Sequence, residues 1–347
     1  MTWPFIIILI VLIIGVLTFF YFQPKQLAKT ESIYTDALNA MVRGDTRTAL
    51  SNLRDVVKQD SEHINAYLQM GNILRQDNNG QAAIKIHQSL MVRPNLDNAI
   101  RLDIHKALAL DFEQVENLSR AQQEAELVLK IDKKNQWANE FLLKIFEKKK
   151  NWDKATQISK TIQRIKKEKD PNQISKYLVY QGMDKLEKGF EIEALNLLEK
   201  AVKTSPKYPL AYLKLGDYYA EKRDLTKAIE NWENFALFDS SDGYTIYSKI
   251  ESALFDLGRF SEVEKFYRRI LDNNPVNLAA LTRLANVLQE KGQNKEALSL
   301  VDETLAKNES SVHAHLMKLK LSLNFSKPHE LSHYIDDIML LLTKNNE

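Results

Sequence analysis

The sequence contains no cysteine among its 347 residues. This absence excludes structural disulfides, thiolate metal ligands and a cysteine nucleophile. Glycine and proline are also scarce, with 10 and 8 residues respectively. Both residue types interrupt helices, whereas the abundant Leu, Lys, Glu and Ala favour them, so we predict an all-α protein.

Neither sign of charge dominates, because 48 basic side chains face 46 acidic ones and leave a net charge of +2. Binding to nucleic acid by counterion release needs concentrated basic charge, so we predict no nucleic-acid partner. One stretch departs from this balance: residues 144–169 hold ten Lys or Arg and three acids. It fits either a surface for an anionic partner (lipid headgroups, an acidic protein or RNA) or a solvated helix face, and we favour the solvated face.

Charge is wholly missing from residues 3–22, which read WPFIIILIVLIIGVLTFFYF. An apolar helix of this length crosses a hydrocarbon core of about 30 Å. A cleaved signal peptide would carry basic residues before the apolar run and a small-residue cleavage site after it, and neither is present. We therefore predict a single transmembrane anchor over residues 1–24, with the lipid bilayer contacted through 3–22, and a linker over 25–31.

The orientation of this anchor follows from the positions of the nearest basic residues. Lys25 and Lys29 come after the apolar run, and no basic residue precedes it. Basic residues favour the cytoplasmic side of a membrane. We predict that the remainder of the chain is cytoplasmic, and we keep the inverted, periplasm-facing topology as the alternative.

The remainder of the chain contains an internal repeat built on pairs of small residues twelve positions apart. Gly71 and Ala83 lie in YLQMGNILRQDNNGQAAIKIHQSL, and Gly216 and Ala228 occupy the same places in YLKLGDYYAEKRDLTKAIENWENF. The second position of each pair falls at 49, 83, 121, 155, 194, 228, 263 and 297, with spacings of 34, 38, 34, 39, 34, 35 and 34. Two of these copies are weaker, with Leu143 before Ala155 and Glu251 before Val263. A period of 34 is typical of the tetratricopeptide repeat, a helix-turn-helix unit. The sequence resembles that family over residues 31 to about 343, which implies a right-handed superhelical solenoid.

Small residues at these positions let two helices cross at the close axis separation of about 8–10 Å. The predicted repeat-packing residues are Ala37, Ala49, Gly71, Ala83, Ala109, Ala121, Ala155, Gly182, Ala194, Gly216, Ala228, Ala285 and Ala297. We predict an array of about eight repeats over residues 32–310 and a capping helix pair over 311–347. The two long spacings place extra residues near 95–99 and 168–174, where we expect longer loops, the second of them a candidate hinge.

The binding surface of such an array is expected on its concave face, which the first helix of each hairpin lines. The predicted groove residues are Asn72, Arg75, Gln76, Lys106, Leu110, Lys144, Asp217, Asn286 and Gln289. One variant of this fold holds a peptide carboxylate with lysine and asparagine one turn apart, but the residues one turn before Asn72 and Asn286 are Leu68 and Thr282. We therefore predict a groove for proteins or peptides without that clamp. A helical array offers no pocket that gathers a nucleophile, a base and oxyanion donors, so we predict no enzymatic activity and no cofactor.

One short string competes with this interpretation. Residues 329–333 read HELSH, which fits the H-E-x-x-H pattern of zinc peptidases. Such an enzyme needs a third ligand, and the extended pattern would place Gly at 336 and His at 339, where this chain has Asp336 and Met339. We expect a polar helix that caps the solenoid instead.

Two further histidines, His313 and His315, lie near this string in the sequence. Histidines two residues apart on one helix point to different faces. We therefore predict no metal site from these residues together with His329 and His333.

The opening of the array is similar to a more specific family. The run from Ala83 to Met91, AIKIHQSLM, matches the corresponding block of lipopolysaccharide assembly protein B. This resemblance implies a bacterial inner-membrane protein with cytoplasmic repeats. It also implies an adaptor role between the deacetylase of lipid A production and a membrane-bound AAA+ protease.

The resemblance has one clear departure. The family carries a C-terminal rubredoxin-like metal domain built from two C-x-x-C pairs, and this chain has no cysteine. We therefore expect that metal module to be absent. We predict a membrane-anchored adaptor or scaffold that mediates protein–protein interactions and presents a client to a membrane protease. The alternatives are a periplasm-facing structural scaffold for envelope assembly and, disfavoured, a zinc peptidase acting through HELSH.

Overall fold

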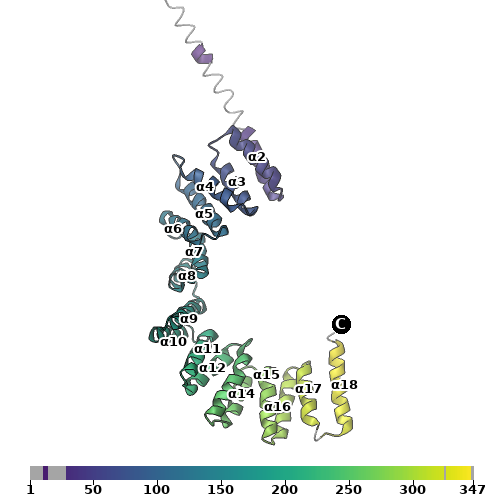
Figure 1. The fold of residues 1–347 in the computed structure, drawn as a ribbon. Helices are drawn as coiled ribbons and strands as arrows, with labels where there is room; N and C mark the ends of the chain where they lie inside the picture. Colours follow the sequence, from purple (N-terminus) through teal and green to yellow (C-terminus); the bar gives the residue numbers. More distant parts are fainter. Residues whose placement is uncertain (1–10, 15–28, 324–325, 345–347) are drawn as a thin grey trace, which may run out of the picture. The chain divides into compact units, whose positions relative to one another are not determined.

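The computed structural model describes residues 11–14, 29–323 and 326–344. Within these ranges every regular element is a helix, and consecutive helices pair into hairpins (Figure 1). The chain divides into two compact units, Met1–Lys169 and Asp170–Glu347. In each hairpin we call the earlier element the first helix and the later one the second helix.

The first unit contains four hairpins. Its first hairpin pairs the helical residues 29–42 with α2, which spans Thr46–Gln59. The following hairpins are α3 (Ile64–Gln76) with α4 (Gly80–Met91), α5 (Asn98–Gln114) with α6 (Leu118–Ile131), and α7 (Gln136–Lys148) with α8 (Trp152–Lys166).

The second unit contains five hairpins. They are α9 (Pro171–Glu187) with α10 (Glu191–Thr204), α11 (Pro209–Glu221) with α12 (Leu225–Phe238), α13 (Tyr247–Asp256) with α14 (Ser261–Asn273), α15 (Leu278–Glu290) with α16 (Asn294–Lys307), and α17 (Val312–Ser322) with α18 (Pro328–Lys344). A short 3₁₀ helix, η1 (Gly243–Ile246), leads directly into α13.

The turns that precede five of the second helices, α2, α4, α6, α8 and α12, have the same local chemistry. The residue before the cap of the second helix has a positive φ, as at Lys150 (52°) and Arg223 (60°). The next residue then caps the helix: the side chain of Asn151 accepts from the Lys154 amide at 3.2 Å, and that of Asp224 accepts from the Lys227 amide at 3.1 Å. These caps satisfy an amide that has no partner within the helix, so they set where the second helix begins.

The extra residues of the two long repeats lie mainly in helices. The helices α5 and α9 have 17 residues each, whereas α3, α7, α11 and α15 have 13. The connection at 167–170 has the length of the other inter-hairpin connections, so the prediction of a longer loop there was wrong. The connection at 92–97 is longer, as is the one at 239–246, which contains η1. The added helical turn precedes Ala109 and Gly182, so these small residues keep their place in the hairpin.

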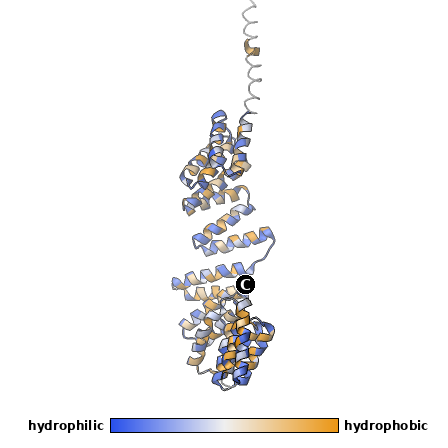
Figure 2. Ribbon diagram, turned by 90° about the vertical axis from the view of Figure 1, so that its right-hand side faces the viewer, coloured by the Kyte–Doolittle hydropathy of each residue, from blue (hydrophilic) through white to orange (hydrophobic). Residues whose placement is uncertain are grey.

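The predicted repeat-packing positions lie in the core of each unit. All ten alanines among them are fully buried, and Gly71, Gly182 and Gly216 are buried as well. The three glycines each meet the second helix sixteen residues later: a Cβ on Gly71, for example, would lie 2.3 Å from Nε2 of His87. Figure 2 shows the resulting pattern, in which hydrophilic and hydrophobic residues occupy different sides of the helices.

Of the predicted anchor, only residues 11–14 are described. They are helical and their side chains are exposed. The rest of the run 3–22 lies outside the described residues. In the ranges that the structure describes, no helix is both long and apolar enough to cross a bilayer.

Candidate functional site

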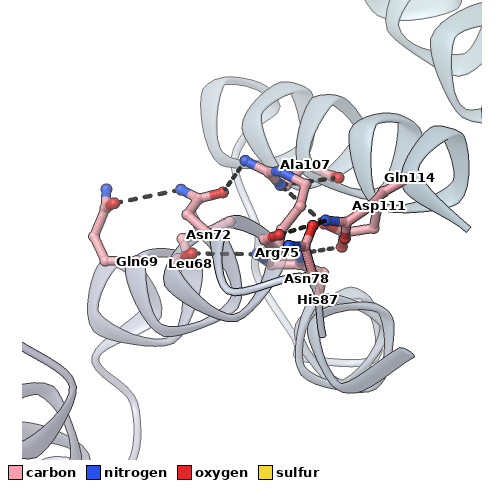
Figure 3. A network of polar contacts seen from close by, with 9 residues as sticks. All are labelled: Leu68, Gln69, Asn72, Arg75, Asn78, His87, Ala107, Asp111 and Gln114. Carbon is pink, nitrogen blue, oxygen red and sulfur yellow. Dashed lines mark hydrogen bonds and ion pairs between the residues drawn. The ribbon is translucent and has the colours of Figure 1, made fainter. Parts of the chain in front are cut away.

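The first unit contains a buried ionic cluster that joins three helices (Figure 3). The Asp111 side chain on α5 is fully buried, and its Oδ2 lies 2.5 Å from Nδ1 of His87 on α4. The other carboxylate oxygen, Oδ1, lies 2.9 Å from the guanidinium of Arg75 on α3. Removing a charge from water is costly unless a partner is held close, so Asp111 fixes the positions of both other side chains.

The imidazole ring of His87 fills the space that is left because residue 71 is a glycine and has no side chain. Its ring lies against Gly71, and its Nε2 is 3.2 Å from the carbonyl oxygen of Leu68. A side chain at position 71 would collide with this ring, so only glycine fits at this position. The His87 of the AIKIHQSLM block is therefore a structural residue of the core.

Two predicted groove residues belong to the same network. Arg75 donates to Oδ1 of Asn72 at 2.9 Å, in addition to its contact with Asp111. Gln114 on α5 donates to the carbonyl oxygen of Arg75 at 2.5 Å. Both Asn72 and Arg75 are partly exposed, so their outer atoms reach solvent while their inner atoms join α3 to α5.

A second charged cluster joins α5 to α7. The Glu113 carboxylate lies 2.7 Å from the ammonium of Lys144 and 2.6 Å from that of Lys148. Partial burial raises the pKa of Glu113, but the hydrogen bonds from both lysines outweigh burial and hold the pKa below its usual value. Both lysines remain largely exposed, so a ligand that carries a carboxylate can approach them.

The remaining predicted residues of the first unit differ in exposure. Gln76 is exposed at the end of α3, and Leu110 is half-buried on α5. Lys106 is also half-buried, with its ammonium 3.6 Å from Asp103 one turn earlier. The first helices of this unit therefore present cations, amides and one leucine.

In the second unit, Asp217 on α11 is held from two sides. Its Oδ1 accepts from Nε1 of Trp232 at 3.2 Å and from the ammonium of Lys249 on α13 at 3.2 Å. Asn286 on α15 accepts from Lys320 on α17 at 3.0 Å. Gln289 is half-buried one turn further along α15.

A third charged cluster, which lies in the second unit, was not predicted from the sequence. The Glu251 carboxylate on α13 accepts from the Tyr267 hydroxyl at 2.6 Å and from Arg283 on α15 at 2.5 Å. Glu251 occupies a position where most hairpins have a small residue. The sequence does contain a signal, because polar partners recur about one repeat apart, as in Glu251 with Arg283 and Asp217 with Lys249.

Ion pairs between neighbouring first helices recur in both units. Lys144–Glu113, Lys249–Asp217 and Arg283–Glu251 each join a first helix to the first helix of the next hairpin and remain partly exposed. Partly exposed pairs contribute little to stability, and they leave donors and acceptors available to a ligand. Such a surface suits an extended or helical peptide held by several weak contacts.

The HELSH residues lie apart from this surface, on α18. His329 and His333 are 75% and 76% exposed, and Nδ1 of His333 lies 3.2 Å from Asp337. His313 contacts the Thr282 hydroxyl, and His315 contacts a backbone carbonyl. Across residues 11–14, 29–323 and 326–344, no group of three or more His, Asp or Glu side chains is placed to hold a metal ion.

The expected polar outer face of α18 is only partly correct. Its early turns do expose the polar residues of HELSH. Further along the helix, however, Ile335, Met339, Leu340 and Leu342 are all exposed. That part of the prediction was wrong, because the tertiary packing covers a different side of the helix.

The repeated hairpins and their polar first-helix surfaces define a helical repeat protein of the kind that mediates protein–protein interactions. The family model for the tetratricopeptide repeat matches residues 40–310, so the chain belongs to the tetratricopeptide repeat family.

Among curated proteins, it is similar to lipopolysaccharide assembly protein B of Haemophilus influenzae, with 26% identity over 81% of this chain and 73% of that protein. It is also similar to lipopolysaccharide assembly protein B of Escherichia coli K12, with 21% identity over 79% of this chain and 70% of that protein. Among solved structures, the MamA protein matches with a TM-score of 0.39 and 19% identity, covering 52% of this chain and 94% of MamA.

Proposed function

We propose that this protein is a membrane-anchored adaptor that holds a segment of a client protein on its first-helix surfaces. The observation that carries this proposal is the similarity to lipopolysaccharide assembly protein B across 81% of the chain. The polar, partly exposed side chains of α3, α5 and α7 support it, because such side chains recognise peptides by hydrogen bonds and charge.

The proposed anchor is the apolar run 3–22, followed by a linker at 25–31, the repeat array at 32–310 and a terminal helix pair at 311–347. Lys25 and Lys29 favour a cytoplasmic array at the inner membrane. Anchoring raises the effective concentration of any partner in the same membrane. The proposed partners are an enzyme of lipid A production as client and a membrane AAA+ protease as its recipient, in lipopolysaccharide assembly.

The test is affinity capture of the full-length tagged protein from membranes in mild detergent, followed by mass spectrometry. The site variants are Lys106→Glu and Lys144→Glu, because both residues lie on first helices and leave the buried cluster intact. Arg75 is unsuitable, since reversing its charge would place a carboxylate beside the buried Asp111. The matched control is Lys85→Glu, an exposed lysine on the second helix α4.

We expect the wild type and Lys85→Glu to recover the same partners and the two site variants to lose at least one of them. If both site variants keep every partner, the first-helix surface of this unit is not the binding site. Recovery of periplasmic or outer-membrane assembly factors would show that the proposed topology is inverted.

A further inference from the structure

The last helix of the array presents an apolar face at a position where the preceding repeats are covered. On α16, Val301 and Leu305 are 0% and 9% exposed. They belong to one core cluster with Ala314, Met317 and Leu321 of α17, the next first helix. On α16 both positions are therefore buried in the core that α16 shares with its neighbouring helices.

One repeat later, the same two positions are uncovered. Residues 34 positions after Val301 and Leu305 are Ile335 and Met339 on α18, and they are 46% and 60% exposed. Leu342, which is 48% exposed, extends the row. Residues at i, i+4 and i+7 share one side of a helix, so Ile335, Met339 and Leu342 form a continuous apolar stripe.

The opposite end of the array does not match this stripe. In the helical residues 29–42, the exposed side chains include Ser32, Thr35, Asp36 and Asn39, with Val42 at the end of the helix. A head-to-tail stack of chains would need an apolar face at both ends, because one end must bury the other. This polar first helix therefore cannot cover the stripe of another copy.

We propose that the stripe Ile335–Met339–Leu342 is covered by the same stripe of a second copy, with the two α18 helices antiparallel about a two-fold axis. A two-fold contact needs only one self-complementary surface, and this chain offers one. The charges fit the antiparallel arrangement: Glu330, Asp336 and Asp337 lie within the first ten residues of α18, whereas residues 338–344 contain no acidic residue. A parallel pair would place the aspartates beside their own copies.

The contact is small, because it rests on three large side chains from each copy. Stable complexes bury about 1,200–2,000 Å² in total, so this dimer is expected to be weak and to exchange. Cross-linking in membranes suits a weak dimer, since it traps the contact as it forms. This proposal does not depend on the client or on the first-helix surfaces.

The test uses the absence of cysteine from the chain. Full-length protein carrying the single change Met339→Cys is treated in membranes with a short thiol-specific bismaleimide. Ser32→Cys, on the polar first helix, is the matched control. We expect a cross-linked band of twice the chain mass from Met339→Cys and none from Ser32→Cys.

A second variant tests the apolar stripe itself. Adding Ile335→Lys to Met339→Cys should reduce the dimer band by about tenfold or more, because a lysine in a buried apolar contact is unfavourable. The proposal is overturned if Met339→Cys remains a monomer, if it cross-links to a different protein, or if Ser32→Cys cross-links equally well. It is also overturned if Ile335→Lys leaves the dimer unchanged while circular dichroism shows a folded protein.

Discussion

Trp232 lies so close to Gly216 that a Cβ built on the glycine would be 2.3 Å from Cδ1 of the indole. The two residues are sixteen positions apart and join α11 to α12. The indole also donates from Nε1 to Asp217, next to the glycine. A core position and a first-helix surface residue are therefore linked through a single aromatic side chain.

The first prediction follows from this contact. Gly216→Ala is expected to destabilise the protein by about 1–3 kcal/mol, because the added methyl group must displace the indole in a packed core. In a Trp232→Ala background the same change should be neutral or stabilising, since alanine favours a helix over glycine by about 1 kcal/mol. Thermal unfolding of the four proteins, followed by circular dichroism, measures both effects. The third hairpin already has alanine at both equivalent positions, Ala109 in place of Gly216 and Ala125 in place of Trp232, so the double variant has a natural counterpart in this chain.

An equal loss from Gly216→Ala in both backgrounds would contradict this explanation. It would show that the glycine is needed for a reason other than the space occupied by Trp232.

The second prediction concerns the buried ionic cluster. Asp111→Ala should cost about 3–5 kcal/mol, because it leaves His87 and Arg75 without their charged partner in the interior. The control is Asp103→Ala on the same helix, where an exposed pair with Lys106 is removed and a change within about 0.5 kcal/mol is expected. Chemical unfolding of both variants gives the comparison. Similar small losses of stability from both changes would mean that the buried contacts of Asp111 do not contribute more to stability than an exposed ion pair.

The third prediction concerns the turns inside the hairpins. Arg223 has a φ of 60°, a conformation that costs a residue other than glycine about 1–2 kcal/mol. Four equivalent turns use Gly44, Gly189, Gly258 and Gly292 at positive φ. We expect Arg223→Gly to raise stability by about 1 kcal/mol, after the entropy cost of glycine is subtracted.

The neighbouring residue supplies the control for this change. Lys222 has a φ of −80°, so Lys222→Gly should lower stability instead. Thermal midpoints that move in the same direction for both variants would contradict the role assigned to the positive φ.

The fourth prediction concerns alkaline pH. Burial, together with the nearby Tyr180, raises the pKa of Tyr208 to about 12, from an ordinary value of 10.0. Above that ordinary value the unfolded chain loses the proton while the folded chain keeps it. The unfolded state then binds fewer protons, so the free energy of unfolding falls as pH rises from 10.0 towards about 12.

Tyr208→Phe removes this contribution, because phenylalanine does not ionise in either state. The variant should lose less stability than the wild type across that pH range, measured as the shift in thermal midpoint. Tyr244→Phe is the control, since Tyr244 is exposed, and it should follow the wild type. A Tyr208→Phe variant with the same pH dependence as the wild type would contradict the assignment.

Several features could be predicted from the sequence because they depend on local or periodic physics. The pairs of small residues, such as Gly71 with Ala83, established the period and hence the helical hairpins. The scarcity of glycine and proline indicated an all-helical chain. The positions of Asn72, Lys106 and Lys144 on first helices followed from the same period.

Other features were decided by contacts between residues far apart in the chain. Asp111, Arg75 and His87 lie on three different helices, and Asp111 contacts the other two in the core. No local sequence pattern specifies that these three polar side chains share one buried site. The extra residues of the fifth hairpin form a helical turn in α9 and not a longer loop, which the spacing of the small residues does not specify.

The sequence by itself determined a tetratricopeptide repeat array, because a period of 34 residues with small residues at fixed places allows few other ways to bury the apolar sides of its helices. Only the tertiary structure decided which apolar side chains stay exposed. Val301 and Ile335 occupy the same place in successive repeats, yet Val301 is buried in the shared core and Ile335 is exposed. Burial depends on the neighbour that a helix meets, and a residue's own chemistry does not contain that information.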